Sequence, residues 1–160
     1  NRKLMLTRVQ EIFSNYFPNI KFGQIINIAH NYAKWEKHFG KDVVVHRKGA
    51  TSAHKGELGI IPGSQGTKSY IVEGLGNPES FSSCSHGAGR VMGRNEAIRR
   101  LSFEEEVRKL NKRGILHSIR THRDLDEAPS AYKNIQQVML DQEDLVKIVT
   151  EVSPLAVIKG

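Results

Sequence analysis

Apolar residues near the start of the chain recur at helical spacing. Neighbours in this set are one, three or four positions apart, as on one face of an α-helix. The set comprises Met5, Val9, Ile12, Phe13 and Tyr16. Pro18 and Asn19 follow directly and are typical of a helix end. The pattern predicts an amphipathic helix over residues 3–17 whose apolar face packs against the rest of the chain.

The pattern then changes to short β-branched or apolar runs. Each run is bounded by Gly, Pro, Asn or lysine-rich breaks, which is typical of short strands. The runs cover residues 25–28, 42–46, 57–61 and 69–72. We therefore expect the middle of the chain to be rich in strands.

Helical spacing returns in the second half. Residues 89–100 and 103–113 are expected to be helices, and Ser102 with Glu105 three positions later indicates a capped start for the second. Residues 115–127 fit neither pattern. The spacing predicts a further helix from about residue 135 to 151 and a closing strand over 154–158. With no internal repeat or linker, residues 1–160 are expected to form a single α+β unit, a mixed strand-rich core flanked by helices.

Composition narrows the class of protein. A chain of 160 residues, 38% hydrophobic and 26% charged, is large enough to build a core without disulfides or structural metal. Its single cysteine excludes an internal disulfide and favours a reducing, cytoplasmic setting. The longest apolar runs are far too short to span a membrane. Because the first residue is Asn1 and not Met, the chain is expected to be cut from something longer.

Charge suggests a partner. The formal net charge is +7, and the segment from Arg90 to Arg123 holds ten basic and four acidic residues. Such an excess favours a phosphate-rich partner such as a nucleic acid. A solvated helical face of mixed charge explains the same residues equally well.

A glycine-rich segment at residues 62–69 is the first candidate for phosphate chemistry. Gly63 and Gly66 would let backbone N–H groups converge on an anion, and Ser64, Thr67 and Ser69 add hydroxyls. The spacing is not that of a Walker A loop. A purely structural turn is at least as good an interpretation.

A second candidate is the segment 83–90. Here His86 is followed by the small residues Gly87, Ala88 and Gly89, which would leave its imidazole accessible and allow a helix to start. A helix N-terminus attracts phosphate, and Arg90 would add charge one turn on. A histidine side chain in water is mostly neutral at pH 7, so its free nitrogen is a nucleophile. The alternative is a hydrogen-bonded loop histidine.

The remaining histidines give weaker signals. His30 would suit a metal and Asn31 a phosphate oxygen, but a metal site needs three or four ligands. His38 is expected to be exposed, and the other histidines show no chelating spacing. Cys84 is expected to be a small buried side chain.

Six short sequence segments together are more specific than any of these motifs alone. They are residues 46–51 (HRKGAT), 59–64 (GIIPGS), 76–81 (GNPESF), 84–90 (CSHGAGR), 128–133 (APSAYK) and 159–160 (KG). In this order they resemble the C-terminal part of the RtcB family of RNA ligases. The resemblance implies an enzyme that joins RNA 2′,3′-cyclic phosphate or 3′-phosphate ends to 5′-hydroxyl ends in tRNA splicing and RNA repair. It also implies the cofactors GTP and Mn²⁺, broken RNA or tRNA halves as partners, and room for an archease-like activating protein.

The resemblance assigns roles to individual positions. His86 matches the nucleophile that takes GMP from GTP, His30 matches a manganese ligand, and Tyr132 and Lys159 match residues that pack on and read the guanine. All the implied nucleotide-binding positions are His30, Asn31, Pro62, Gly63, Ser64, Gln65, Ser69, His86, Gly87, Ala88, Gly89, Tyr132 and Lys159.

The chain also departs from the family pattern. Gln65 stands where Met is common, Ser82 stands where Cys is frequent, and the other expected manganese ligands lie upstream of this chain. The chain alone is therefore expected to hold manganese poorly and to be inactive or nearly so. The competing interpretation is a non-catalytic, basic RNA- or nucleotide-binding module.

Overall fold

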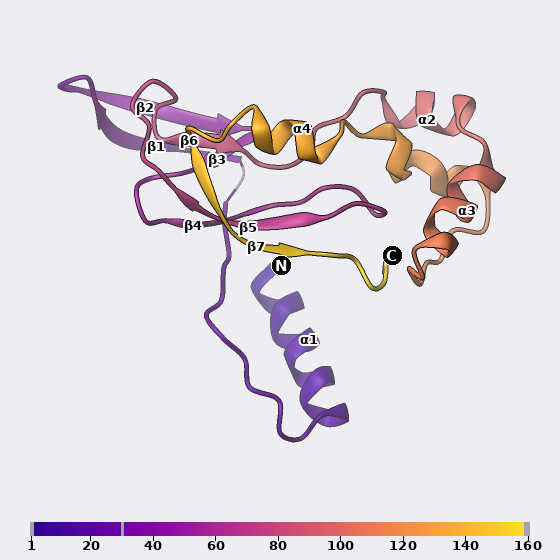
Figure 1. The fold of residues 1–160 in the computed structure, drawn as a ribbon. Helices are drawn as coiled ribbons and strands as arrows, with labels where there is room; N and C mark the ends of the chain where they lie inside the picture. Colours follow the sequence, from indigo (N-terminus) through magenta and orange to yellow (C-terminus); the bar gives the residue numbers. More distant parts are fainter. Residues whose placement is uncertain (1, 30, 159–160) are drawn as a thin grey trace.

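The computed structural model describes residues 2–29 and 31–158 (Figure 1). Helices and antiparallel sheets share the chain, which confirms the α+β class. The elements in order are α1 (Arg2–Tyr16), β1 (Asn31–His38), β2 (Lys41–Lys48), β3 (Ala50–Ser52), β4 (Leu58–Ile61), β5 (Ser69–Gly74), β6 (Ser83–Ser85), α2 (Arg94–Arg100), α3 (Phe103–Lys112), the 3-10 helices η1 (His122–Glu127) and η2 (Pro129–Ala131), α4 (Ile135–Leu140) and β7 (Val146–Val152).

Within the described residues the strands form three antiparallel sheets. β1 pairs with β2, β3 pairs with β6, and β4, β5 and β7 form a sheet with β5 in the centre. The β1–β2 hairpin is in register from its open end to a two-residue turn at Phe39 and Gly40. Both turn residues have positive φ, as the tight turns that match the twist of a hairpin require.

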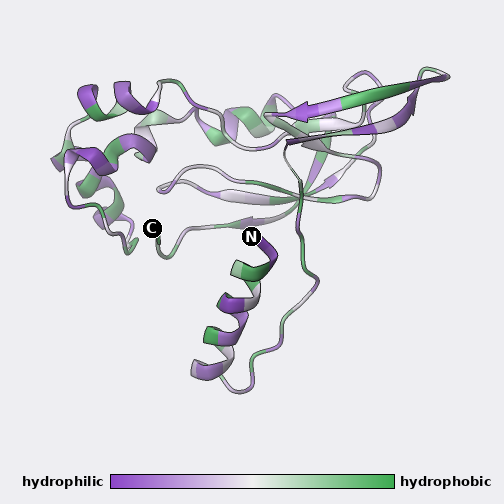
Figure 2. Cartoon of the chain, turned by 180° about the vertical axis from the view of Figure 1, so that it is seen from behind, coloured by the Kyte–Doolittle hydropathy of each residue, from purple (hydrophilic) through white to green (hydrophobic). Residues whose placement is uncertain are grey.

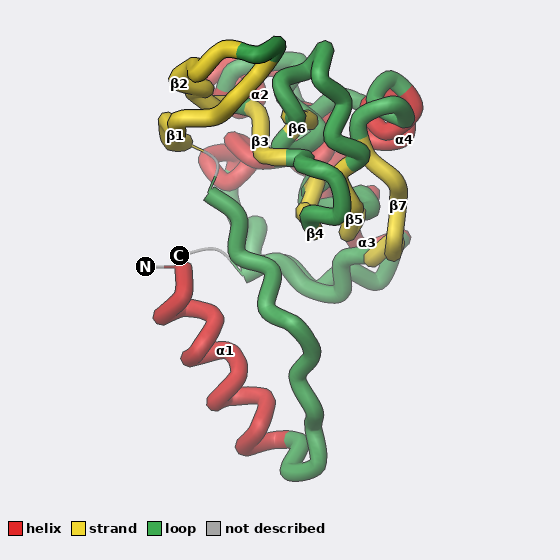
Figure 3. The backbone as a smooth tube through the Cα atoms, turned by 90° about the vertical axis from the view of Figure 1, so that its left-hand side faces the viewer, coloured by secondary structure: helices red, strands yellow, loops and turns green. Residues whose placement is uncertain are grey.

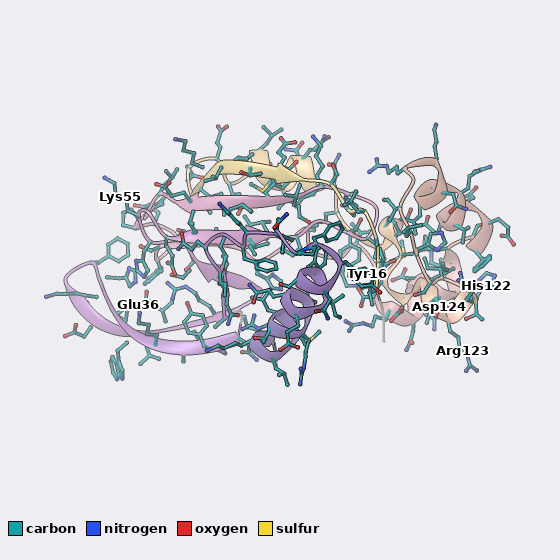
Figure 4. All side chains as sticks on the ribbon, turned by 90° about the horizontal axis from the view of Figure 1, so that it is seen from below. Tyr16, Glu36, Lys55, His122, Arg123 and Asp124 are labelled. Atoms are coloured by element: carbon teal, nitrogen blue, oxygen red, sulfur yellow. The ribbon has the colours of Figure 1, made fainter. Side chains whose placement is uncertain are left out.

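A buried ion pair holds the inner face of the hairpin. Arg47 is 1% exposed and donates to both carboxylate oxygens of Glu36, at 2.5 and 2.8 Å. It also donates to Ser83 Oγ at 2.9 Å and to the Phe81 carbonyl at 2.8 Å, which ties the hairpin to the loop before β6. The hydrogen bond from Arg47 lowers the pKa of Glu36 to about 2 against the opposing effect of burial. Figure 4 shows Glu36 at one end of the molecule, in the β1–β2 hairpin.

His38 shares this face, so the expectation that it is exposed was wrong. The side chain is 8% exposed and lies 2.9 Å from a Glu36 oxygen. Side chains alternate across a strand, and positions 36 and 38 therefore point to the same side of β1.

Two clusters of buried side chains form the core. One lies between the sheet β4–β5–β7 and α4 and includes Ile61, Val72 and Met139. Cys84 belongs to this cluster, as expected, and burial raises its pKa to about 11. The other cluster joins α3 to the segment 115–128 and is centred on Leu110 and Leu125, both fully buried.

Helix α1 has the predicted bounds to within one residue, but it does not pack as expected. None of its side chains is buried against the described part of the chain. Figures 1 and 3 show α1 apart from the sheets, joined to them by an extended segment, and Figure 2 shows apolar positions along it that no other element covers. Arg2 donates to the Ile28 carbonyl, and Arg2 and Leu6 line a cavity together with residues of the body of the molecule.

Several other expected elements differ. Residues 25–28 form no strand, because no neighbouring strand pairs with them. The helix expected from residue 135 to 151 ends at Leu140. A turn follows, and the edge strand β7 begins at Val146 and pairs with β5. Residues 154–158 make only the isolated bridge between Leu116 and Ala156. None of the described helices has the length and apolar character that crossing a membrane requires.

Candidate functional site

A cavity of about 770 Å³ lies where the end of β4, the loop after β6 and Tyr132 come together. Arg2 and Leu6 of α1 and the extended segment 26–28 form another side of it. Its volume falls in the range of small-molecule and cofactor sites, which is about 300–1,000 Å³. A nucleotide therefore fits by size.

Main-chain hydrogen bonds hold the wall of this cavity together. Ala88 N–H donates to the Pro62 carbonyl at 2.9 Å, which joins the loop after β6 to the end of β4. Lys133 N–H donates to the Gly89 carbonyl at 2.9 Å, which joins the same loop to the segment after η2. Gly89 has a φ of +72°, a conformation that glycine adopts without strain. Three segments distant in sequence are thus fixed against one another by their backbones.

His86 lines the cavity directly after β6 and is partly exposed. The residues on both sides of it are fixed. Ser85 N–H donates to the Gln142 side chain at 3.0 Å, and the Ser85 hydroxyl donates to the Gly87 carbonyl. The imidazole therefore sits at the edge of a space large enough for a nucleotide, on a short segment whose backbone is held in place.

The expectation that a helix starts behind His86 was wrong. Residues 89–91 instead lie alongside residues 131–133, and α2 begins only at Arg94. Positive charge next to the cavity comes from Arg2 and Arg90, which both line it. The guanidinium carbon of Arg90 lies 4.9 Å from the centre of the Tyr132 ring. Side chains, and not a helix dipole, therefore supply the attraction for an anion.

For the glycine-rich segment 62–69 the sequence left two interpretations open, an anion cradle and a structural turn, and its hydrogen bonds favour the turn. Gly63 N–H donates to Ser69 Oγ at 3.2 Å, and Ser64 N–H donates to Thr67 Oγ1 at 2.6 Å. Gly66 N–H donates to Ser64 Oγ at 3.4 Å. Because the hydroxyls of the loop occupy these three amides, the segment is a self-contained turn.

The positions that the resemblance assigned to the nucleotide divide into three groups. Those that line the cavity are Pro62, Gly63, His86, Gly87, Ala88, Gly89 and Tyr132. Those that do not line it are Asn31, Ser64, Gln65 and Ser69. Asn31 begins β1 opposite Lys48, and Gln65 Oε1 is buried without a hydrogen-bond partner among the described residues. His30 and Lys159 lie outside the described residues.

The described residues do not form a metal centre. No three of their His, Cys, Asp or Glu side chains are placed to hold an ion together. The expected manganese ligand His30 lies outside this part of the chain. A metal would therefore need ligands beyond those that the structure describes.

Sequence reasoning missed several polar residues of the site, among them Arg2 and Asn27, which line the cavity. Thr51 lines the cavity from β3, and Glu127 binds both Arg90 and Tyr132 from behind its wall. Glu127 lies just beyond the basic segment from Arg90 to Arg123, close to Asp124 and Asp126, and no motif singles it out. Much of the basic segment from Arg90 to Arg123 lies in α2, α3 and the start of η1. Figure 4 shows His122, Arg123 and Asp124 at the opposite end of the molecule from Glu36.

A cavity of nucleotide size with an accessible histidine and an arginine on its wall defines a candidate phosphate-transfer site. The sequence model of the RtcB family, described as tRNA-splicing ligase RtcB, matches residues 1–160. The chain therefore belongs to the RtcB family.

Individual relatives agree with this assignment. The chain is 49% identical over 138 residues to the RNA-splicing ligase RtcB of Escherichia coli K12. The matched region covers 84% of the chain and 32% of that protein. It is 38% identical to the tRNA-splicing ligase RtcB of Nanoarchaeum equitans, covering all of the chain and 39% of that protein. For the tRNA-splicing ligase RtcB of Pyrococcus horikoshii the identity is 36%, over all of the chain and 22% of that protein. The chain thus spans well under half the length of these relatives.

Proposed function

We propose that this chain carries the nucleotide-transfer site of a GTP-dependent RNA ligase. The enzyme would join RNA 2′,3′-cyclic phosphate or 3′-phosphate ends to 5′-hydroxyl ends, as in tRNA splicing and RNA repair. The observation that supports this most is the position of His86, partly exposed on the wall of a cavity of about 770 Å³ beside Arg90 and Tyr132.

The proposed chemistry begins at the imidazole. A ring nitrogen of His86 attacks the α-phosphorus of GTP, the bond to the β-phosphate oxygen breaks, and pyrophosphate leaves. The product is a phosphoramidate, in which GMP is bonded to the ring through a P–N bond. Arg90 lies on the same wall, where its charge would offset the negative charge of the phosphates. Tyr132 offers an aromatic face for the base.

Two transfers complete the reaction. An oxygen of the RNA 3′-phosphate attacks the phosphorus of GMP, and the imidazole leaves as the P–N bond breaks. The 5′-hydroxyl of the second RNA then attacks the activated 3′-phosphate, loses its proton and releases GMP. A cyclic phosphate must first be opened by water to the 3′-phosphate, because the ring itself has no terminal phosphate to attack with.

The proposal assigns only part of the active centre to this chain. The family resemblance implies Mn²⁺ with His30 as one ligand, whereas the described residues do not assemble a metal site. We infer that further ligands come from a region corresponding to the upstream part of the longer relatives. On this basis the 160-residue chain alone should transfer GMP poorly or not at all.

The test is incubation with α-phosphate-labelled GTP and manganese. The 160-residue chain and a chain extended upstream are compared. The extended chain should acquire label that is lost in acid and stable in alkali, as expected for a phosphoramidate. His86→Ala should abolish the label, while His46→Ala, on the exposed face of β2, should keep it. No label on the extended chain, or an unchanged label in His86→Ala, refutes the proposal.

Base selection and RNA binding give separate tests. Lys159→Ala should reduce the preference for GTP over ATP, and unchanged discrimination would show that the guanine is read elsewhere. RNA affinity should fall steeply with added salt, because the basic residues between Arg90 and Arg123 would displace counterions from the RNA backbone.

A non-catalytic nucleotide- or RNA-binding module is the second candidate. The basic segment from Arg90 to Arg123 and the cavity of nucleotide size would serve binding alone equally well. Such a module would bind GTP or RNA without ever acquiring covalent label, so the labelling experiment separates the two functions.

A further inference from the structure

Glu127 lies behind the cavity wall and binds three side chains at once. Its Oε2 accepts hydrogen bonds from Arg90 Nη1, at 3.0 Å, and from the Tyr132 hydroxyl. Its Oε1 accepts one from Arg94 Nε at 2.8 Å. Arg90 and Tyr132 line the cavity, whereas Glu127 does not. The carboxylate can therefore act on a bound ligand only through the residues that it holds.

Arg90 is held in one orientation by contacts around its whole guanidinium group. Besides Glu127 it donates to the Asp126 carbonyl at 2.6 Å, the Met92 carbonyl at 2.9 Å and the Tyr132 hydroxyl at 3.1 Å. These contacts use four of its five N–H groups and leave one for a ligand. The guanidinium also stacks on the Tyr132 ring, at 4.9 Å from ring centre to carbon.

Tyr132 closes the arrangement into a triangle. Its hydroxyl donates to Glu127 and accepts from Arg90, while Arg90 donates to the same Glu127 oxygen. The backbones of residues 90 and 132 also face each other in an isolated antiparallel bridge. The backbone thus brings the two residues together, and Glu127 fixes the ends of their side chains.

The charge states fit this arrangement. Burial alone would raise the pKa of Glu127, but hydrogen bonds from Tyr132 and Arg94 and the charge of Arg90 lower it below its usual value. Burial, together with the nearby Glu127 carboxylate, raises the pKa of Tyr132. At neutral pH the carboxylate is therefore ionised and the phenol keeps the proton that it donates.

We propose that Glu127 is a positioning residue that holds Arg90 and Tyr132 as one rigid unit on the wall that they share with His86. The unit presents a cation and an aromatic face at a fixed separation, which suits a nucleotide with phosphates on one side and a base on the other. This inference rests on the proposed function in taking GTP as the ligand. Holding both groups in place before binding lowers the entropy lost when the ligand binds.

The test is the isosteric variant Glu127→Gln in the upstream-extended chain, with GTP affinity measured by equilibrium dialysis. A carboxylate accepts hydrogen bonds on both oxygens, whereas an amide has one oxygen and one NH₂ group. In Glu127→Gln the NH₂ group must therefore face the N–H group of one of the two arginines. GTP should bind roughly tenfold more weakly, which corresponds to about 1.4 kcal/mol. The matched control is Glu96→Gln, which removes a carboxylate paired with Arg100 on the surface of α2 and should change affinity less than about twofold.

A second measurement separates positioning from general destabilisation. In an Arg90→Lys background the forked contacts are absent. In that background Glu127→Gln should weaken GTP binding by no more than about threefold. The effects of substitutions at two residues that act through each other do not add, because the first substitution has already removed the interaction. Full additivity, or equal GTP affinity in Glu127→Gln and the parent chain, overturns the positioning role.

The experiments distinguish a failure of the proposed function from a failure of the role of Glu127. If GTP binds but no label forms on His86, the covalent chemistry is wrong, while the affinities still decide the role of Glu127. If the extended chain does not bind GTP at all, both proposals are overturned.

Discussion

Replacing Arg47 by leucine should be among the most damaging single changes outside the cavity. Arg47 is 1% exposed and joins the β1–β2 hairpin to the loop before β6 through Glu36, Ser83 and Phe81. Its removal leaves the Glu36 carboxylate, whose side chain is 6% exposed, without its main partner. An unpaired buried charge costs far more than the pair contributes over an apolar substitute.

The loss of stability in Arg47→Leu can be estimated in two ways. The pKa of Glu36 is lowered from 4.5 to about 2, with the Arg47 hydrogen bond as the largest cause. One pKa unit corresponds to about 1.4 kcal/mol, so the folded environment favours the charged form by a net amount of about 3 kcal/mol, burial included. Removal of one partner from buried ion pairs generally costs about 3–5 kcal/mol. We therefore expect Arg47→Leu to lower the free energy of unfolding by about 3 kcal/mol at pH 7.

Urea unfolding followed by far-UV circular dichroism measures this loss. Because the pKa of Glu36 is depressed in the folded state, its stabilising effect is complete above about pH 4.5 and is lost as the pH falls towards about 2. The difference between the parent chain and Arg47→Leu should therefore narrow over that range.

A double variant provides the control. Replacing Glu36 as well, in Glu36→Leu/Arg47→Leu, removes the orphaned charge and should recover roughly half of the lost stability. A loss below about 1 kcal/mol in the single variant, or a double variant less stable than the single one, would show that the pair does not hold the hairpin in place.

Three further outcomes are expected. Gly63→Ala should cost about 2 kcal/mol or more in urea unfolding, because its Cβ would lie 2.1 Å from the Lys68 carbonyl oxygen, whereas Gly93→Ala, with open space around it, should change little. Cys84 should react with a thiol reagent at pH 8 only after unfolding, because it is buried and its pKa is about 11; rapid reaction of the native chain would contradict this. Leu110→Ala should cost about 2–5 kcal/mol, because the side chain is fully buried in the second core cluster, and a loss below about 1 kcal/mol would contradict that packing.

Elements with strong local signals could be predicted from the sequence. α1 and α3 follow from helical spacing, and the Ser102 hydroxyl accepts from Glu105 N–H at 3.3 Å, as the capping pattern indicated. β2, β4 and β5 follow from runs of β-branched residues. In each case residues close in sequence carry the information.

Elements that depend on a distant partner could not be predicted. β1 contains mostly polar and charged residues and is a strand because β2 pairs with all of it. β7 has apolar spacing that suggested a helix, but its pairing with β5 decides the outcome. Residues 25–28 have the composition of a strand and lack a neighbour to pair with.

The candidate site shows the same division. The family resemblance brought together His86, Gly87 and Tyr132, which do line one cavity. The predicted helix behind His86 failed because residues 89–91 bond to residues 131–133, some forty positions away. Glu127 had no motif of its own, because its importance comes from three partners that only the fold assembles.

The way the cavity wall is joined also has a consequence for how the chain folds. The loop after β6 exchanges main-chain bonds with Pro62 before it and with residues 131–133 after it. Each of these bonds closes a long loop of chain, which is slow compared with forming a helix or a hairpin. The β1–β2 hairpin and α3 should therefore gain protection from amide hydrogen exchange early during refolding. The amide of Ala88 should gain it later, once Pro62 is in place, and that of Lys133 once Gly89 is in place.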